Sequence, residues 1–148
     1  MQKFSLRPAV QQDASTIKQL IIAGRINPTG LDWMRFFVAE TDGGEVIGCG
    51  QIKPHRDHSY ELASIAVRED WRGRGVARKI IEDLMSNYGE APLYLLCGSG
   101  VGKLYEKFGF RVLSIEEMPK YYRRVSKLVG WVQPLVDRGE SLLIMGRD

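Results

Sequence analysis

A basic, glycine-rich turn stands between an apolar stretch and an amphipathic one. It reads Arg72, Gly73, Arg74, Gly75, Val76, Ala77 and Arg78. The backbone N–H groups of such a turn point in one direction, as does the positive end of the following helix dipole, and together they form a site for phosphate. The glycines omit the Cβ atoms that would block a phosphate, and the arginines add charge. The turn therefore predicts a phosphorylated cofactor.

Two common phosphate-binding patterns do not fit this turn. A Walker A loop requires G-x-x-x-x-G-K-[ST], and no stretch of the chain matches it. The dinucleotide fingerprint G-x-G-x-x-G needs a third glycine where Arg78 stands. Both nucleotide interpretations are therefore excluded.

The turn resembles the [RQ]-x-x-G-x-[GA] signature of the GCN5-related N-acetyltransferases, the GNAT superfamily, whose loop wraps the pyrophosphate of acetyl-CoA. About 30 residues later, the stretch Leu104-Tyr-Glu-Lys-Phe-Gly-Phe110 is similar to the family's F-Y-x-x-x-G-F ending. The resemblance covers roughly residues 4–113. It implies an acetyl-CoA-dependent enzyme that transfers an acetyl group directly to a primary amine within a ternary complex.

The resemblance also implies which residues bind the cofactor. The backbone of Ile65, Ala66 and Val67 on the family's fourth strand is expected to contact acetyl-pantetheine, with the Val67 N–H donating to the oxyanion. The loop from Arg72 to Arg78 is expected to hold the pyrophosphate. An Asn that the family often carries seven residues before its Tyr is replaced by Gly98, so Ser99 or backbone groups would substitute.

Two catalytic residues are implied in the same way. Tyr105 occupies the family's general-acid position, where a phenol can give its proton to the leaving thiolate. Glu61 lies where some members carry a Glu that acts as base, directly or through water. Because side chains alternate along a strand, Glu61, Ala63 and Ile65 are expected to share a face. The alternative for Glu61 is an exposed carboxylate at the end of a strand.

Several nearby residues remain weaker candidates. His55 and His58 fall in a polar turn and are interpreted as solvated. Tyr60 could line the acceptor site. Residues 27–36 stand where the family places its variable acceptor loop, and Trp33 and Phe36 either wall that pocket or pack in the core. The sequence of residues 26–33 resembles that of small bacterial, cyanobacterial and plastid members of the family.

Periodicity and turn residues predict the elements that position these side chains. Strands are expected at 4–8, 35–40, 45–52, 60–67, 93–97, 110–113 and 141–145. Helices are expected after Asp13, which would cap the first, briefly at 31–34, at 75–88, and up to Lys107. The resemblance implies the GNAT α/β fold: one domain over residues 1–148, with a twisted, mostly antiparallel mixed sheet, a splayed strand pair and helices on both faces.

A further helix is predicted between the last two strands, over residues 118–136, where the simplest family pattern has only a loop. Its apolar face would either shape the acceptor pocket as a flap or pack on the sheet. The opposite face carries Lys120, Arg123, Arg124 and Lys127. A solvated face is favoured there over an acidic substrate, RNA or a membrane surface.

Composition bounds the remaining possibilities. The chain has 148 residues, a formal net charge of +3 and two cysteines, Cys49 and Cys97, which are expected to be buried, reduced thiols. The mild charge argues against a nucleic-acid partner, and the Cys and His spacing argues against a metal site.

With no apolar run of membrane-spanning length, a cytoplasmic protein is expected. The acceptor is left open among small molecules, peptides and proteins, as is a homodimer. The alternative function is a non-catalytic acyl-CoA sensor or interaction module.

Overall fold

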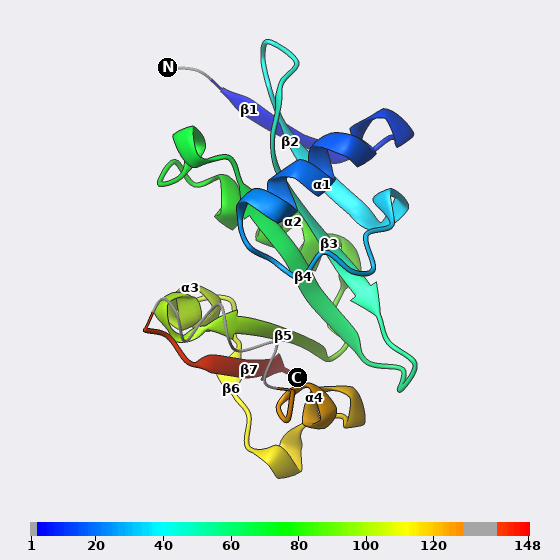
Figure 1. Ribbon diagram of the computed structural model, residues 1–148, viewed down its shortest axis with the longest axis vertical. Helices are drawn as coiled ribbons and strands as arrows, with labels where there is room; N and C mark the ends of the chain where they lie inside the picture. Colours follow the sequence, from blue (N-terminus) through cyan, green and yellow to red (C-terminus); the bar gives the residue numbers. More distant parts are fainter. Residues whose placement is uncertain (1–2, 129–138) are drawn as a thin grey trace. The chain divides into compact units, whose positions relative to one another are not determined.

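The computed structural model describes residues 3–128 and 139–148, and Figure 1 shows their helices and strands. Residue contacts divide the chain into two compact units. The first comprises residues 1–53 and 62–89, and the second comprises residues 54–61 and 90–148.

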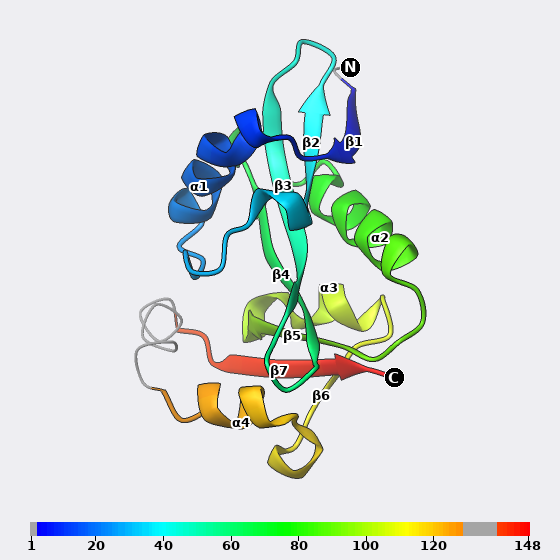
Figure 2. The same cartoon turned by 90° about the vertical axis from the view of Figure 1, so that its right-hand side faces the viewer.

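The first unit contains four strands and two long helices. The strands are β1 (Phe4–Pro8), β2 (Phe36–Thr41), β3 (Val46–Pro54) and β4 (Tyr60–Val67), the last two reaching into the second unit. Strands β1, β2 and β3 pair antiparallel in that order. The helices are α1 (Ala14–Ala23) and α2 (Val76–Tyr88), which lie on opposite faces of this sheet (Figure 2). The predicted short helix before β2 is a 3-10 turn at Trp33–Arg35.

The two faces of β3 pack against different helices because its side chains alternate. Cys49 faces α1, in a core with Ile17, Ile21 and Val38. Gly50 faces the other way: a Cβ there would lie 2.7 Å from the Ile80 Cγ2 atom of α2. Only glycine therefore allows α2 to approach the strand this closely.

Asp13 is predicted to cap α1. It immediately precedes that helix, but its carboxylate makes no capping hydrogen bond. It accepts hydrogen bonds from Arg7 at 2.7 and 3.1 Å and from the Val10 N–H at 2.8 Å. Arg7 also pairs with Glu40 of β2 at 3.1 Å. A carboxylate this buried is stable only with such partners, so the ion pair fastens the start of α1 to β1.

Replacing Asp13 by Asn is expected to lower the free energy of unfolding by about 1–3 kcal/mol at neutral pH. The hydrogen bonds from Arg7 hold the pKa of Asp13 below its ordinary value, despite burial. Because the folded-state pKa is lowered, this stabilisation is present above the unfolded value and is lost as pH falls through the folded one. Urea denaturation at pH 7 and at about pH 3 should show the difference from wild type shrinking in acid. The exposed Asp42→Asn variant is the control.

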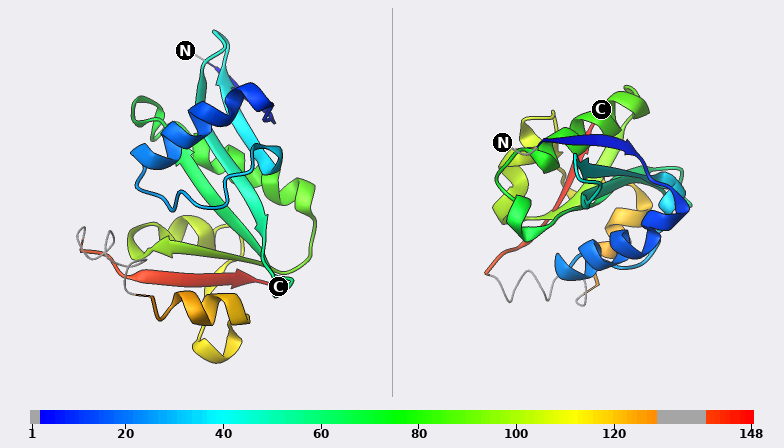
Figure 3. Two further views of the ribbon diagram at one scale, coloured as in Figure 1. Left: turned by 45° about the vertical axis from the view of Figure 1, so that its right-hand side comes forward. Right: turned by 90° about the horizontal axis from the view of Figure 1, so that it is seen from above.

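In its described residues, the second unit is built on three antiparallel strands. They are β5 (Leu93–Gly98), β7 (Leu142–Arg147) and β6 (Arg111–Val112), adjacent in that order. Glu61, in the part of β4 that belongs to this unit, pairs with Tyr94 of β5 in a parallel sense. Figure 3 shows α3 (Gly102–Glu106) and α4 (Lys120–Val125) on opposite sides of β5 and β7. The whole strand order is β1-β2-β3-β4-β5-β7-β6, a mixed sheet as predicted.

The helix predicted over residues 118–136 is much shorter where it is described. α4 begins at Lys120, directly after Pro119, and ends at Val125 with Ser126 as its C-cap. Tyr122 and Val125 are buried, and Tyr122 packs with Leu113 and Ile144 of the sheet. The described part of this segment therefore packs on the sheet, while the rest of the predicted helix lies outside the described residues.

Candidate functional site

Both glycines of the basic turn adopt a left-handed backbone. The φ angles are 76° at Gly73 and 83° at Gly75, which residues with a Cβ rarely adopt. A Cβ at either position would meet nothing within 4 Å. Backbone conformation, more than crowding within the chain, therefore accounts for glycine at both positions.

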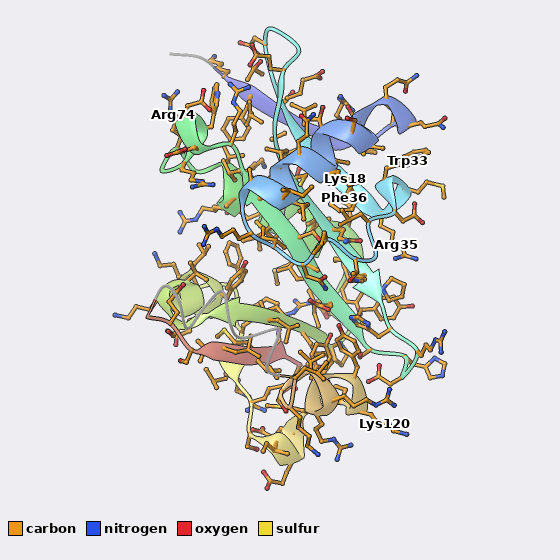
Figure 4. The ribbon with its side chains drawn as sticks, in the orientation of Figure 1. Lys18, Trp33, Arg35, Phe36, Arg74 and Lys120 are labelled. Carbon is orange, nitrogen blue, oxygen red and sulfur yellow. The ribbon has the colours of Figure 1, made fainter. Side chains whose placement is uncertain are left out.

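The arginines of the turn differ in their surroundings. Arg72 donates from Nε to the Val67 carbonyl of β4 at 3.1 Å, and the Arg74 guanidinium lies 4.8 Å from the centre of the Trp71 ring. Arg74 is labelled on this turn in Figure 4. Together with Arg78, both are exposed, and none of the three pairs with a carboxylate of the described residues. The turn therefore keeps its positive charge available for an anion.

The turn ends at the first residue of α2. Gly75 is the N-cap, and its carbonyl accepts the N–H of Lys79 at 3.1 Å. The N–H groups of Val76, Ala77 and Arg78 precede any possible helical acceptor, so they are open to a ligand. Glycine geometry, a helix N-terminus and exposed guanidinium groups together fit a pyrophosphate.

Strand β4 is irregular in its middle. Ser64 has a φ of 60°, so the side-chain alternation expected from Glu61 to Ile65 does not carry through it. Ile65 lies over Gly50 on the α2 side, and Ala66 belongs to the core around α1. The sequence does not indicate the break at Ser64, because serine does not favour a left-handed backbone conformation.

A buried amide connects β3, β4 and the loop before β2. Gln51, fully buried, donates from Nε2 to the Ser64 hydroxyl at 2.9 Å and to the Gly30 carbonyl at 3.2 Å. Lys53 adds a hydrogen bond to the Thr29 carbonyl of the same loop at 3.1 Å. The loop predicted to contact the acceptor is thus fastened to the sheet by polar residues that the sequence analysis did not single out.

Replacing Gln51 by Met is expected to lower the free energy of unfolding by about 1–3 kcal/mol. Methionine has a similar volume, but it leaves the Gly30 carbonyl without its amide donor. Urea denaturation measures the loss, and hydrogen exchange should rise in residues 27–32. The control is Gln19→Met on the exposed side of α1, where little change is expected. Equal stability of both variants would contradict a role in fastening the loop.

Tyr105, the predicted general acid, lies in the second unit on α3. Its ring meets Phe110 edge-on at 6.2 Å, and its hydroxyl makes no hydrogen bond to a described residue. Burial raises the pKa of Tyr105 above its ordinary value, so the phenol stays protonated. Ser99, the predicted substitute for the missing Asn, already accepts the Ser141 N–H at 3.1 Å.

Glu61 is buried, which contradicts the alternative of an exposed carboxylate at a strand end. Its side chain is 9% exposed, and Oε1 lies 2.7 Å from the Nε2 atom of His55, itself 8% exposed. The prediction of a solvated His55 is therefore wrong. His58 is exposed as expected and adopts a φ of 69° at the tip of the turn.

The turn between β3 and β4 explains why His55 is buried. The His55 N–H donates to the Ser59 carbonyl at 2.9 Å, so the turn is a tight hairpin that returns Glu61 beside His55. Tyr121 of α4 then covers the imidazole, with ring centres 3.6 Å apart. The hairpin register could have revealed the pair, but the covering ring comes from a distant part of the chain.

The remaining candidates from the sequence lie either in the core or at the surface. Phe36 is buried in the α1 core and Trp33 packs against it, which supports the core interpretation of both. Cys49 and Cys97 are free thiols, the latter only partly buried. The basic residues of the α4 segment are exposed, and Lys120 is labelled in Figure 4. Among the described residues, no group of three or more His, Cys, Asp or Glu could hold a metal. Nor is any described helix long and apolar enough to cross a membrane.

Comparison with known proteins establishes the family. The family described as "Acetyltransferase (GNAT) domain" matches residues 32–112, more than half of the chain. This chain belongs to the GNAT acetyltransferase family. The match spans β2, the β3–β4 turn, the glycine-rich turn and Tyr105, so it includes every predicted cofactor and catalytic residue.

Solved structures share the GNAT fold over nearly the whole chain. Rv2747 from Mycobacterium tuberculosis, solved with CoA and NLQ, is 21% identical with a TM-score of 0.71, covering 97% of this chain and 98% of its own. N-acetylglutamate synthase from Neisseria gonorrhoeae, solved with coenzyme A and N-acetyl-glutamate, is 20% identical with a TM-score of 0.71. That match covers 98% of this chain and 35% of the synthase. The predicted fold class is confirmed.

A curated plant protein is similar over part of the chain. GCN5-related N-acetyltransferase 4, chloroplastic, from Arabidopsis thaliana is 34% identical over 74 residues, which are 46% of this chain. The match spans 25% of the plant protein's length.

Proposed function

We propose that this GNAT chain transfers the acetyl group of acetyl-CoA to a primary amine within a ternary complex. The observation that carries the proposal is the turn from Arg72 to Arg78. It combines two left-handed glycines, three guanidinium groups without carboxylate partners among the described residues, and the open N-terminus of α2. Holding both substrates on one enzyme would supply much of the rate by proximity.

In the proposed reaction, each step has a residue to carry it. Glu61 removes a proton from the ammonium form of the acceptor, directly or through water, and the neutral nitrogen attacks the thioester carbonyl. The backbone of Ile65, Ala66 and Val67 binds acetyl-pantetheine, and the Val67 N–H steadies the oxyanion. As the carbon–sulfur bond breaks, Tyr105 gives its proton to the thiolate, and the second proton that the nitrogen loses restores the phenol through solvent.

The acceptor is proposed only by class. An amine on a small molecule, peptide or protein fits the chemistry, and the N-acetyl-glutamate bound to the synthase supports an amino acid as one candidate. We propose that residues 1–148 act as a single domain, without a metal. A cytoplasmic location remains a prediction, and the name of the plant relative places that protein in the chloroplast.

Calorimetry with acetyl-CoA tests the cofactor, and an amine panel with detection of free thiol tests the transfer. We expect saturable binding and release of CoA that depends on the amine. Absence of binding at about 1 mM acetyl-CoA, at the upper end of common KM values, would rule out the proposal. Binding without consumption of thioester across the panel would favour the alternative, an acyl-CoA sensor or interaction module.

A further inference from the structure

The contact between His55 and Glu61 is unusually enclosed for two ionisable side chains. The two side chains are 8% and 9% exposed, and 2.7 Å separates His55 Nε2 from Glu61 Oε1. An ionised carboxylate can only accept, so with Glu61 in the form that a general base requires, Nε2 carries the hydrogen in this contact and donates it to Oε1. Oε2 makes no hydrogen bond to a described residue, so it is the carboxylate oxygen left with its full acceptor capacity for proton transfer.

The imidazole is itself held from several directions. Its ring is stacked on Tyr121 with 19° between the planes, and it meets Tyr122 edge-on at 5.8 Å. The N–H of Tyr121 donates to Asp57 Oδ2 at 2.9 Å. The other oxygen of Asp57 accepts the Ser59 hydroxyl at 2.6 Å. The turn and α4 therefore fix the imidazole ring from two parts of the chain.

We propose that His55 is the positioning residue of the general base. It holds Glu61 by Nε2–H, so that Oε2 is the atom that receives the proton of the acceptor. The inference rests on the proposed role of Glu61 as base, and it extends the site to α4 through Tyr121. In each turnover the ammonium N–H bond breaks, an O–H bond forms on Glu61, and the proton later leaves to solvent.

A purely structural role would have other consequences. Buried charged pairs are often no more stabilising than apolar residues of similar volume, so stability alone gives little reason for a histidine here. A positioning role needs the N–H donor at the Nε2 position and no more. Glutamine can place an amide N–H near that position, whereas leucine cannot, and this difference separates the two roles.

Steady-state kinetics on the whole chain compare His55→Leu with His55→Gln. We expect His55→Leu to lower kcat by about 10- to 10²-fold, the range seen for partners that orient a reactive group. The KM for acetyl-CoA should stay unchanged, and His55→Gln should recover much of the rate. In the Glu61→Gln background, His55→Leu should cause no further loss, because the two residues act as one unit. His58→Asn, at the exposed tip of the same turn, is the control and should match wild type.

Because the chain has only two histidines, His58→Asn also leaves His55 as the single source of imidazole signals. Nitrogen-15 NMR of that variant should show a hydrogen on Nε2 of His55, and adding Glu61→Gln should alter its signal. This measurement tests the inference even if the His55→Leu variant does not fold.

Three results would overturn the inference. Equal kcat for the Leu and Gln variants, an additive loss in the Glu61→Gln background, or an imidazole signal unaffected by Glu61→Gln would each do so while leaving acetyl transfer intact. No transfer by wild type to any amine would instead remove the proposed function, and the role of His55 with it.

Discussion

Glu61→Gln is expected to lower kcat by about 10²- to 10⁴-fold, the usual contribution of a positioned general base. Glutamine keeps the size of the side chain and can still meet His55, but it cannot take up a proton. The acceptor amine is mostly protonated at neutral pH and would have to lose its proton to water. The loss should therefore be smaller at alkaline pH, where more of the amine is already neutral.

The measurement is a pH–rate profile for the wild type and the variant, with the affinity for acetyl-CoA determined separately by calorimetry. The affinity should hold within about twofold, because Glu61 lies outside the turn that is proposed to bind the cofactor. Glu90→Gln, an exposed carboxylate of the same unit, serves as the control and should leave the profile unchanged. A pH–rate profile of Glu61→Gln identical to that of wild type would remove Glu61 from the role of base.

Tyr105→Phe is expected to lower kcat by about 10²-fold with little change in acetyl-CoA affinity. The substitution removes one oxygen that makes no hydrogen bond to a described residue, so the fold should tolerate it. Burial raises the pKa of Tyr105, which keeps the phenol protonated as pH rises. Tyr105 should therefore cause no alkaline loss of activity below about pH 10, the ordinary value for a phenol.

Turnover with a series of acceptors, together with the midpoint of urea unfolding, checks this expectation. The midpoint of Tyr105→Phe should match that of wild type, so that any loss of rate reflects chemistry. If the thiolate instead takes its proton from solvent, the variant will turn over at the rate of wild type, and Tyr105 will have only a packing role against Phe110.

Local patterns predicted most of the elements because their signals lie within a few residues of each other. β4 has the bounds expected, and α2 begins within one residue of the predicted start, since its apolar side chains recur at helical spacing after two glycines. The helix predicted from residue 118 was too long in its described part. Within the described residues, the short α4 satisfies the helical periodicity with Tyr121, Tyr122 and Val125.

Contacts between distant residues could not be predicted in this way. A histidine in a polar turn is usually solvated, but the rings of Tyr121 and Tyr122, 66 and 67 positions further along the chain, cover His55. The amide of Gln51 likewise has no partner nearby in the sequence, and its bonds to Gly30 and Ser64 exist because the sheet places them together.

The sequence by itself determined the conformation and charge of the turn from Arg72 to Arg78 and the order of the elements. Glycine conformation, helix initiation and arginine charge are properties of consecutive residues, so Arg72 to Arg78 could be interpreted without the fold. Only the tertiary structure decided the surroundings of Glu61. Whether a carboxylate is solvated or enclosed depends on which side chains the folded chain brings against it, and here His55 and the tyrosines of α4 enclose it.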